Sequence, residues 1–320
     1  MLSRVADSLY WMSRYLERAE HTARVLNVNL HGLLDQKDDV VQQRWRRVAR
    51  SLYMPAVPDT GFEPYLVAAS LTFDARVPGS IVNSIVSARQ NAREIREQIS
   101  TEMWEQINRM FLHVQHAQRL GIWDTDAHAF FQAVRDGSHL FQGMSDTTLS
   151  HDEGWLFIQL GRYIERVQSI VRLLGVHFDD PAVPEDGSFA IEDYMEWVGL
   201  LKSCTAFEAY CRLHTANIQP DRAMGFLLLH PSFPHSVHFG IRMILSALEA
   251  LSESIPLMKQ SEAYRQAGKL ASSLQFDPIG DILAGDVQGY LEEIHHRCLQ
   301  IHDSVFETCI TYPLNYNLAY

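Results

Sequence analysis

The sequence repeats one long helical pattern, and this repetition constrains the fold more than any other feature. The residues LYWMSRYLERAEHTARVL at 9–26 return as FIQLGRYIERVQSIVRLL at 157–174, displaced by 148 positions. From Arg14 to Leu26, six of the thirteen residues are identical in the second copy, where unrelated sequence would give about one. Each copy contains a glutamate followed directly by an arginine. A functional hypothesis for this chain must therefore account for a duplicated Glu-Arg pair.

Both copies have the apolar spacing of a helix that is packed along its length. From Leu2 to Leu30 the apolar residues follow steps that alternate three and four, and Phe157 to Leu174 keep the same spacing. This heptad spacing predicts a long helix that packs lengthwise on its neighbours with a left-handed supercoil. Ala19 and Ala23 lie in the middle of the apolar stripe, so we expect another helix to approach the first copy closely there.

The rest of the chain also has helical spacing and predicts an all-α fold of roughly ten helices. Period-2 alternation is missing from the sequence, as is any Asn-Gly or Asp-Gly turn between alternating runs. Proline and glycine at 54–64 and 179–188 predict loops. Beyond the two long copies, the expected helices cover 39–53, 65–73, 80–120 as one helix or two nearly continuous ones, 126–140, 232–255, 258–274 and 279–311.

Weaker similarities follow the two long copies in the same order and extend the repetition. Trp197-x-x-Leu200 repeats Trp45-x-x-Val48 at a displacement of 152, and 227–234 repeats 71–78 at a displacement of 156. Similarities that keep one order with slowly growing displacements indicate a tandem duplication with small insertions. We therefore expect a helical bundle built from two repeats, 1–147 and 148–320, which pack as one globular body.

Charge and cysteine content exclude several classes of protein. A formal net charge of −12 opposes general nucleic-acid binding, because contact with phosphates needs a basic surface. No stretch approaches the roughly 20 apolar residues of a membrane span, and Arg4 and Asp7 interrupt the region where a signal peptide would be apolar. We expect a cytoplasmic protein that binds neither membrane nor nucleic acid. Four cysteines are too few for a disulfide scaffold, and we expect Cys204 and Cys211 to share one helix face as small buried side chains.

The helical projection separates the glutamate of each pair from its arginine. At about 100° per residue, Glu17 borders the buried stripe centred on Leu16, whereas Arg18 points further round and is expected to reach a different neighbour. One turn before each glutamate the residue is small, which leaves room for another helix or a ligand above the carboxylate. The repeated unit is thus a small residue, the glutamate and a distal arginine: Ser13, Glu17 and Arg24 in one copy, and Gly161, Glu165 and Arg172 in the other.

Two interpretations of the Glu-Arg pairs remain open. In the first, each glutamate forms a buried salt bridge between two helices, and Arg89 or Arg93 is the expected partner of Glu17. In the second, the pairs line one cavity, with Glu17 or Glu165 as general base or amine ligand and arginines as carboxylate or phosphate anchors. The candidate catalytic residues are therefore Glu17 and Glu165. The candidate binding residues are Arg14, Arg18, Arg24, Arg89, Arg93, Arg162, Arg166 and Arg172.

Other motifs for chemistry are missing from the sequence or incomplete. The stretch EEIHH at 292–296 contains two overlapping Glu-x-x-His spacings, but a di-iron bundle requires this spacing on a second helix as well. The sequence has no glycine-rich phosphate loop, no nucleophile elbow and no dinucleotide fingerprint. We therefore expect no metal and no cofactor, and whether the protein is an enzyme stays open.

Three stretches of the chain resemble one bacterial family. They are LSRVADSLYWMSRYLERAEHTARVL at 2–26, PGSIVNSIVSARQNAREIREQIS at 78–100 and FLLLHPSFPHSVHF at 226–239. Together with the two Glu-Arg pairs, they identify the chain as similar to the alpha-E family, which is named for its helices and its ER motif. A tandem duplication with an ER motif in each copy is typical of that family. His230 departs from the pattern, since an acidic residue is expected there.

The resemblance implies partners rather than a reaction. Alpha-E genes typically lie beside, or are fused to, those of circularly permuted ATP-grasp ligases and transglutaminase-like proteins. The resemblance thus implies a helical accessory protein in a peptide synthesis or modification system, which positions a peptide or docks the ligase. The alternative is an enzyme whose paired Glu-Arg motifs act as a carboxylate and arginine site on an amino acid or peptide.

Overall fold

The fold is all-α, as expected, in a computed structural model that describes residues 1–31, 38–52, 54, 63–121, 126–178, 191–215 and 217–310. These residues contain no strand, and none of their helices is long and apolar enough to cross a membrane. The helices are α1 (Ser3–His31), α2 (Asp38–Ser51), α3 (Pro64–Phe73), α4 (Ile81–Glu94), α5 (Thr101–Leu120), α6 (Ala127–Thr148), α7 (Glu153–Phe178), α8 (Ile191–Ser203), α9 (Phe207–His214), α10 (Pro220–Leu229), α11 (Val237–Ser254), α12 (Glu262–Phe276), α13 (Ile279–Ala284) and α14 (Val287–Val305).

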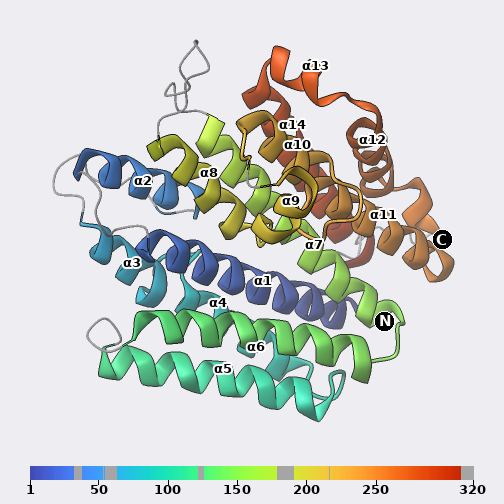
Figure 1. Cartoon of the computed structure of the whole chain (residues 1–320). Coiled ribbons are helices and arrows are strands. Elements are labelled where there is room, and N and C mark those ends of the chain that lie inside the picture. Colours follow the sequence, from blue (N-terminus) through green and yellow to red (C-terminus); the bar gives the residue numbers. More distant parts are fainter. Residues whose placement is uncertain are drawn as a thin grey trace, which may run out of the picture.

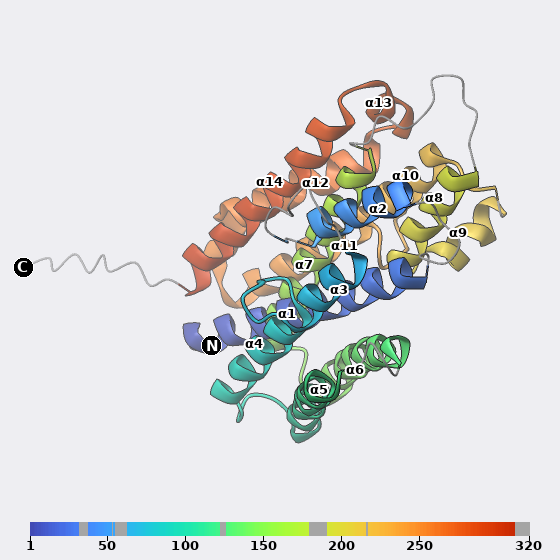
Figure 2. The ribbon, with the colours of Figure 1, turned by 90° about the vertical axis from the view of Figure 1, so that its left-hand side faces the viewer.

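The two copies of the repeated stretch are the central helices α1 and α7, which pack on each other at the middle of the molecule (Figure 1). Each carries its own group of neighbours. Helix α1 contacts α4 and α6, and α5 joins those two, whereas α7 contacts α11 and α14, and α12 joins those two. Figure 2 shows the α5–α6 pair and the α12–α14 pair on opposite sides of the central helices. Because they are covered from both sides, α1 and α7 have few exposed faces, and their polar residues must find partners inside the protein.

The contact pattern of the first half recurs in the second. The pairings of α1 with α4 and α6 correspond to those of α7 with α11 and α14. The pairings of α5 with α4 and α6 correspond to those of α12 with α11 and α14. Helix α6 ends at Thr148 and α7 begins at Glu153, so the predicted repeat boundary falls at this connection. The division into 1–147 and 148–320 stays a prediction, for which these paired contacts are the structural counterpart.

Two predicted helices are interrupted where a new helix is capped. The 80–120 stretch stops at Glu94 and restarts at Thr101, where the Ser100 hydroxyl accepts a hydrogen bond from the Met103 amide. The 279–311 stretch divides between α13 and α14, where the Asp286 carboxylate accepts from the Gly289 amide. Side-chain caps of this kind satisfy helix N-termini and define where each helix begins. These two breaks, together with α8, α9 and α10 between residues 191 and 229, bring the described residues to fourteen α-helices, and the predicted all-α fold is confirmed.

Two further predictions are corrected. Helix α6 runs to Thr148 instead of ending near residue 140, because Phe141 and Ser145 continue its buried face beyond that point. Cys204 and Cys211 do not share a helix, since α8 ends before the first and α9 contains only the second. Cys204 is buried, and Cys211 is half-buried. The predicted loop at 179–188 lies outside the described residues, as does most of the loop at 54–64.

Candidate functional site

Each glutamate of the ER motif is paired with the arginine of the other copy. Arg18 donates from Nε to Oε1 of Glu165 at 2.6 Å and from Nη2 to Oε2 at 3.0 Å. Arg166 donates in the same way to Glu17, at 2.5 Å and 3.0 Å. Both contacts are two-pronged, which is the strongest geometry for an arginine and a carboxylate. The duplicated motif therefore forms two reciprocal bridges between α1 and α7.

The two bridges differ in their additional partners. Arg14 donates from Nε to Oε2 of Glu165 at 2.8 Å, so this carboxylate is held by two guanidinium groups. Arg14 also donates from Nη2 to Gln168 at 2.8 Å. Glu17 instead accepts a third bond from the amide of Gln142 on α6, at 3.1 Å. Glu165 therefore lies in the more positive surroundings of the two.

Both carboxylates are removed from solvent. Glu165 is 0% exposed and Glu17 is 2% exposed. Burial alone would raise the pKa of Glu165, but the charges of Arg18 and Arg14 outweigh it and lower that pKa to about 2. Burial would lower the pKa of Arg166, and the adjacent Glu17 carboxylate reverses this and raises it. Glu165 and Arg166 are therefore charged at neutral pH, each stabilised by its partner rather than by water.

The small residues of the repeated unit make room for the opposing helix. The Ser13 hydroxyl donates to the carbonyl of Ile158 at 2.7 Å. A Cβ atom on Gly161 would lie 2.3 Å from the carbonyl oxygen of Tyr10, closer than any real contact. Ile158 is the counterpart of Tyr10 in the second copy, and Gly161 is the counterpart of Ser13. The contacts are thus reciprocal, as at an interface with a two-fold axis.

Three expectations about the arginines are wrong. Arg18 does not reach a neighbour different from that of Glu17, because both reach α7 across the close crossing of the central helices. Arg89 and Arg93 are not partners of Glu17, since α4 turns its apolar stripe towards α1. Arg89 donates to Asn108 on α5 at 2.7 Å, and its guanidinium lies 4.5 Å from the Phe111 ring centre. Arg93 is exposed.

The other candidate arginines lie apart from the two bridges. Arg162 donates to Gln159 and, at 3.4 Å, to the Tyr163 hydroxyl. Arg24 donates to Glu20, one turn before it on α1, rather than to Glu17. Arg172 lines a cavity of about 310 Å³ between α7 and α14. Its other lining residues include Arg50, Gln288, Glu292 and His295.

The Glu-x-x-His spacing at 292–295 thus borders this cavity. Among the residues that the structure describes, however, no three His, Cys, Asp or Glu side chains are grouped to hold a metal ion. Neither this cavity nor the one between α2 and α8 is lined by Glu17 or Glu165.

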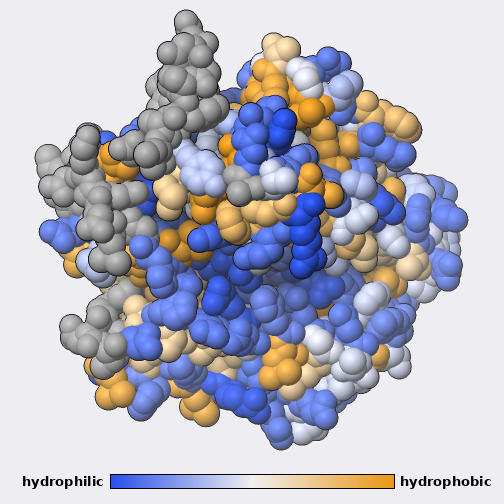
Figure 3. Space-filling model, in the orientation of Figure 1, coloured by the Kyte–Doolittle hydropathy of each residue, from blue (hydrophilic) through white to orange (hydrophobic). Residues whose placement is uncertain are grey.

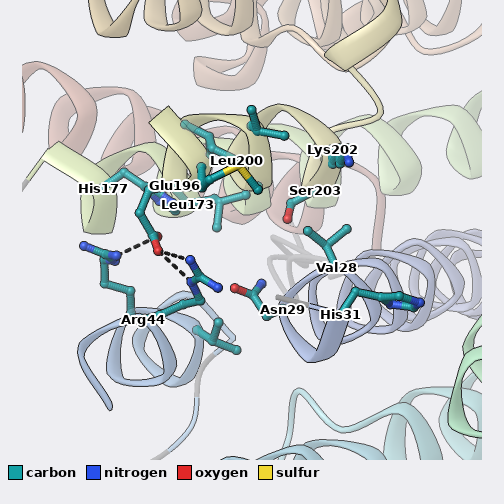
Figure 4. Close-up of a pocket in the computed structure, with 15 residues that line it drawn as sticks. Val28, Asn29, His31, Arg44, Leu173, His177, Glu196, Leu200, Lys202 and Ser203 are labelled. Atoms are coloured by element: carbon teal, nitrogen blue, oxygen red, sulfur yellow. Dashed lines mark hydrogen bonds and ion pairs between the residues drawn. The ribbon is translucent and has the colours of Figure 1, made fainter. Parts of the chain in front are cut away.

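A cavity between α2 and α8 that contains a cluster of charged side chains was not expected from the sequence. Its volume is about 150 Å³, and it lies beside the C-terminal ends of α1 and α7 (Figure 4). Glu196 bridges two arginines across it, accepting from Arg44 Nε at 2.6 Å and from Arg47 Nη2 at 2.6 Å. Arg44 and Glu196 each precede the tryptophan of the repeated Trp motif. The opposite charges of Arg44 and Glu196, at equivalent positions of the two repeats, could therefore have predicted this second contact between the halves.

Comparison with known proteins agrees with the motif. A family model named alpha-E, described as a predicted alpha-helical domain with a conserved ER motif, matches residues 1–309. The chain belongs to the alpha-E family. The match is continuous over both halves, so it contains both reciprocal bridges.

The relatives of this alpha-E chain are much longer proteins. It is 24% identical over 278 residues to uncharacterized protein Mb2597 of Mycobacterium bovis and to uncharacterized protein Rv2567 of Mycobacterium tuberculosis. These matches cover 78% of this chain and 30% of each relative, so the chain spans about a third of their length. No solved structure matches the chain.

Proposed function

We propose that this alpha-E protein is a helical accessory protein of a peptide synthesis or modification system, where it docks an ATP-grasp ligase or positions the ligase's peptide. The observation that carries the proposal is the engagement of both ER glutamates by arginines of the opposite half. A motif that locks two helices together explains its own duplication without a reaction. The buried position of the motif supports a scaffold that binds its partner through its outer surface and not through the ER motif.

The chemistry of the bridges disfavours catalysis at the motif. A general base works best with a pKa near the working pH, and the pKa of Glu165 is lowered to about 2. Catalysis by this residue would require Arg14 and Arg18 to leave a buried carboxylate first, at a cost of several kcal/mol. The enzyme alternative therefore needs a rearrangement that the accessory function does not.

The relatives also support an accessory function. In the mycobacterial proteins the matched region is 30% of a longer chain, so it is joined there to other sequence. A helical region that acts on or beside another protein is often linked to it covalently, because linkage raises its effective concentration.

Co-purification with the ATP-grasp ligase of the same organism tests the proposal. We expect the two proteins to elute as one complex, and deletion of the alpha-E protein to lower the yield of ligated peptide. A single-charge change on the surface, such as Glu105→Gln on α5, serves as a folded control. If the proteins do not associate and ligation is unaffected by the deletion, the accessory function is wrong.

A further inference from the structure

A second charged cluster lies beside the ER bridges, on α1, α6 and the turn before α11. Glu20 and Arg24 on α1 are 2% and 7% exposed, and Arg24 donates from Nη2 to Glu20. His139 on α6 lies at the surface, with Nε2 3.5 Å from Oε1 of Glu20 and 3.4 Å from Nη2 of Arg24. Figure 3 shows hydrophilic side chains gathered in a depression over α1, between α6 and α9. The cluster thus connects a buried ion pair to the surface.

Several buried nitrogen atoms of this cluster lack a hydrogen-bond acceptor in the part of the chain that the structure describes. The Nε atoms of Arg24 and Arg135 are buried and have no hydrogen-bond acceptor among the described residues. The same is true of Nε2 of His21, on the neighbouring position of α1. Leaving a buried donor unsatisfied costs about 1–3 kcal/mol, and more when it is charged. Two such guanidinium groups in one place indicate a missing acceptor.

The charges in the cluster point to the same kind of ligand. Arg24 donates to the buried carboxylate of Glu20, and the charges of Glu20 and of the exposed Asp136 both act on Arg135. Burial lowers the pKa of Arg135, and the like charge of Arg24 lowers it further. Burial, together with the charges of Arg166 and Arg24, holds the pKa of His235 well below its usual value. The repulsion between Arg24 and Arg135, together with their unbonded Nε atoms, thus favours an anionic ligand.

We propose that Arg24, Arg135 and His139 form a binding site for a small oxyanion group, either a carboxylate or a phosphate. Oxygen atoms of the ligand would supply the acceptors that both guanidinium groups lack, and arginine presents its donors in a planar fork that suits either group. Glu20 positions Arg24 and His139 from the buried side. The site is separate from the ER bridges and stands independently of the proposed accessory function.

Titration with two kinds of probe tests the site and distinguishes its ligand. The probes are inorganic phosphate, and N-acetyl-dialanine with a free carboxylate or with an amidated C-terminus, all at constant ionic strength in chloride. We expect calorimetry to show saturable binding of phosphate or of the free-acid peptide, with the amidated peptide inactive. The NMR signals of the Nε–H groups of Arg24 and Arg135 should shift with the same saturation.

Variants on the half-exposed side of the cluster make the test specific. Arg135→Gln should weaken binding at least tenfold, while Asp136→Asn, which removes a nearby negative charge, should strengthen it. Arg265→Gln on α12 removes the same charge on the opposite side of the central helices from α6 and should leave binding unchanged. Since Arg135 is only partly buried, this comparison holds even where a variant of Arg24 does not fold.

The probe that binds identifies the ligand: phosphate binding alone assigns a phosphate group, and binding of the free-acid peptide alone assigns a carboxylate. Both results support the proposal. It is overturned if neither probe saturates, or if Arg135→Gln binds as tightly as the natural chain.

Discussion

Among single residues, Glu165 carries the strongest electrostatic contacts of the ER motif. It is fully buried and held by Arg14 and Arg18, whereas Glu17 is held by Arg166 and the amide of Gln142. Removing either carboxylate leaves a buried guanidinium without its counter-charge, which costs more than the pair itself contributes. Replacement of Glu165, which neutralises two arginines, should therefore destabilise the protein more than replacement of Glu17.

Glu165→Gln should lower the free energy of unfolding by about 3–5 kcal/mol, because it removes the counter-charge of the buried Arg14 and the partly buried Arg18. Glu17→Gln should also destabilise the protein, but by less, since one arginine loses its partner. Urea unfolding followed by circular dichroism gives both values, and the exposed Glu105→Gln on α5 should lie within about 0.5 kcal/mol of the natural chain. Equal stability of all three variants would contradict a structural function of the motif.

The same carboxylate should make stability depend on acid pH. The folded-state pKa of Glu165 is about 2, below its usual value of 4.5, so its contribution is present above pH 4.5 and is lost as the pH falls towards 2. The difference in unfolding free energy between the natural chain and Glu165→Gln should then shrink by about 2 kcal/mol between pH 7 and pH 3. Urea titrations at pH 7, 5 and 3 measure it. A difference that stays constant with pH would show that Glu165 is not an ionised partner.

Among the elements, the close crossing of α1 and α7 depends on the lack of a side chain at Gly161. A glycine inside a helix costs about 1 kcal/mol relative to alanine, yet α7 has Gly161 at its most buried part. The reason lies on the opposing helix, where the Tyr10 carbonyl occupies the space that a Cβ would need. Both the Ser13 bond to α7 and the reciprocal arginine bridges require this short separation.

Gly161→Ala should therefore destabilise the protein by more than 1 kcal/mol, against helix propensity, because the backbone of α1 has to move away. Gly143→Ala on α6 is the matched control, since a Cβ there meets nothing within 4 Å. It should stabilise the protein by up to about 1 kcal/mol. Thermal unfolding distinguishes the two by opposite shifts of Tm. A rise of Tm in Gly161→Ala would contradict the close crossing.

In the whole molecule, the glutamate of each half is neutralised by an arginine of the other half. Helices α4 and α6 pack on α1, and α11 and α14 pack on α7. Among the described residues, the arginines bonded to Glu17 and Glu165 all lie across the central crossing. The bridge from Glu196 to Arg44 and Arg47 adds a second link between α8 and α2. Neither half should then satisfy its buried charges alone.

The fragment 1–147 should consequently lack a cooperative unfolding transition when produced alone, because Arg14, Arg18 and Glu17 would lose their partners in α7. Mixing it with 148–320 should restore cooperative unfolding and a single species in size-exclusion chromatography. Circular dichroism on each fragment and on the mixture measures this. Cooperative folding of 1–147 by itself would mean that the halves are independent domains.

Comparison with the structure shows which features of this chain its residue patterns predicted. The heptad spacing from Leu2 to Leu30 predicted α1 closely, since a stripe of that regularity is compatible with only one kind of element. The same projection placed Glu17 only at the border of the buried stripe, whereas the structure buries both Glu17 and Glu165. The projection did not predict that Arg18 and Glu17 share a partner helix, because it gives the direction of a Cβ and an arginine side chain extends well beyond it.

The sequence by itself thus determined the helical class, the two long repeated helices and the alpha-E motif, all of which depend on neighbours within a few turns or on similarity between two stretches. Only the tertiary structure decided that Glu17 meets Arg166 rather than Arg89, and that Arg24, Arg135 and His139 come together. These contacts depend on which helices pack and at what separation. Long charged side chains then reach whichever opposite charge lies closest in a dry interior, where an unpaired charge is costly.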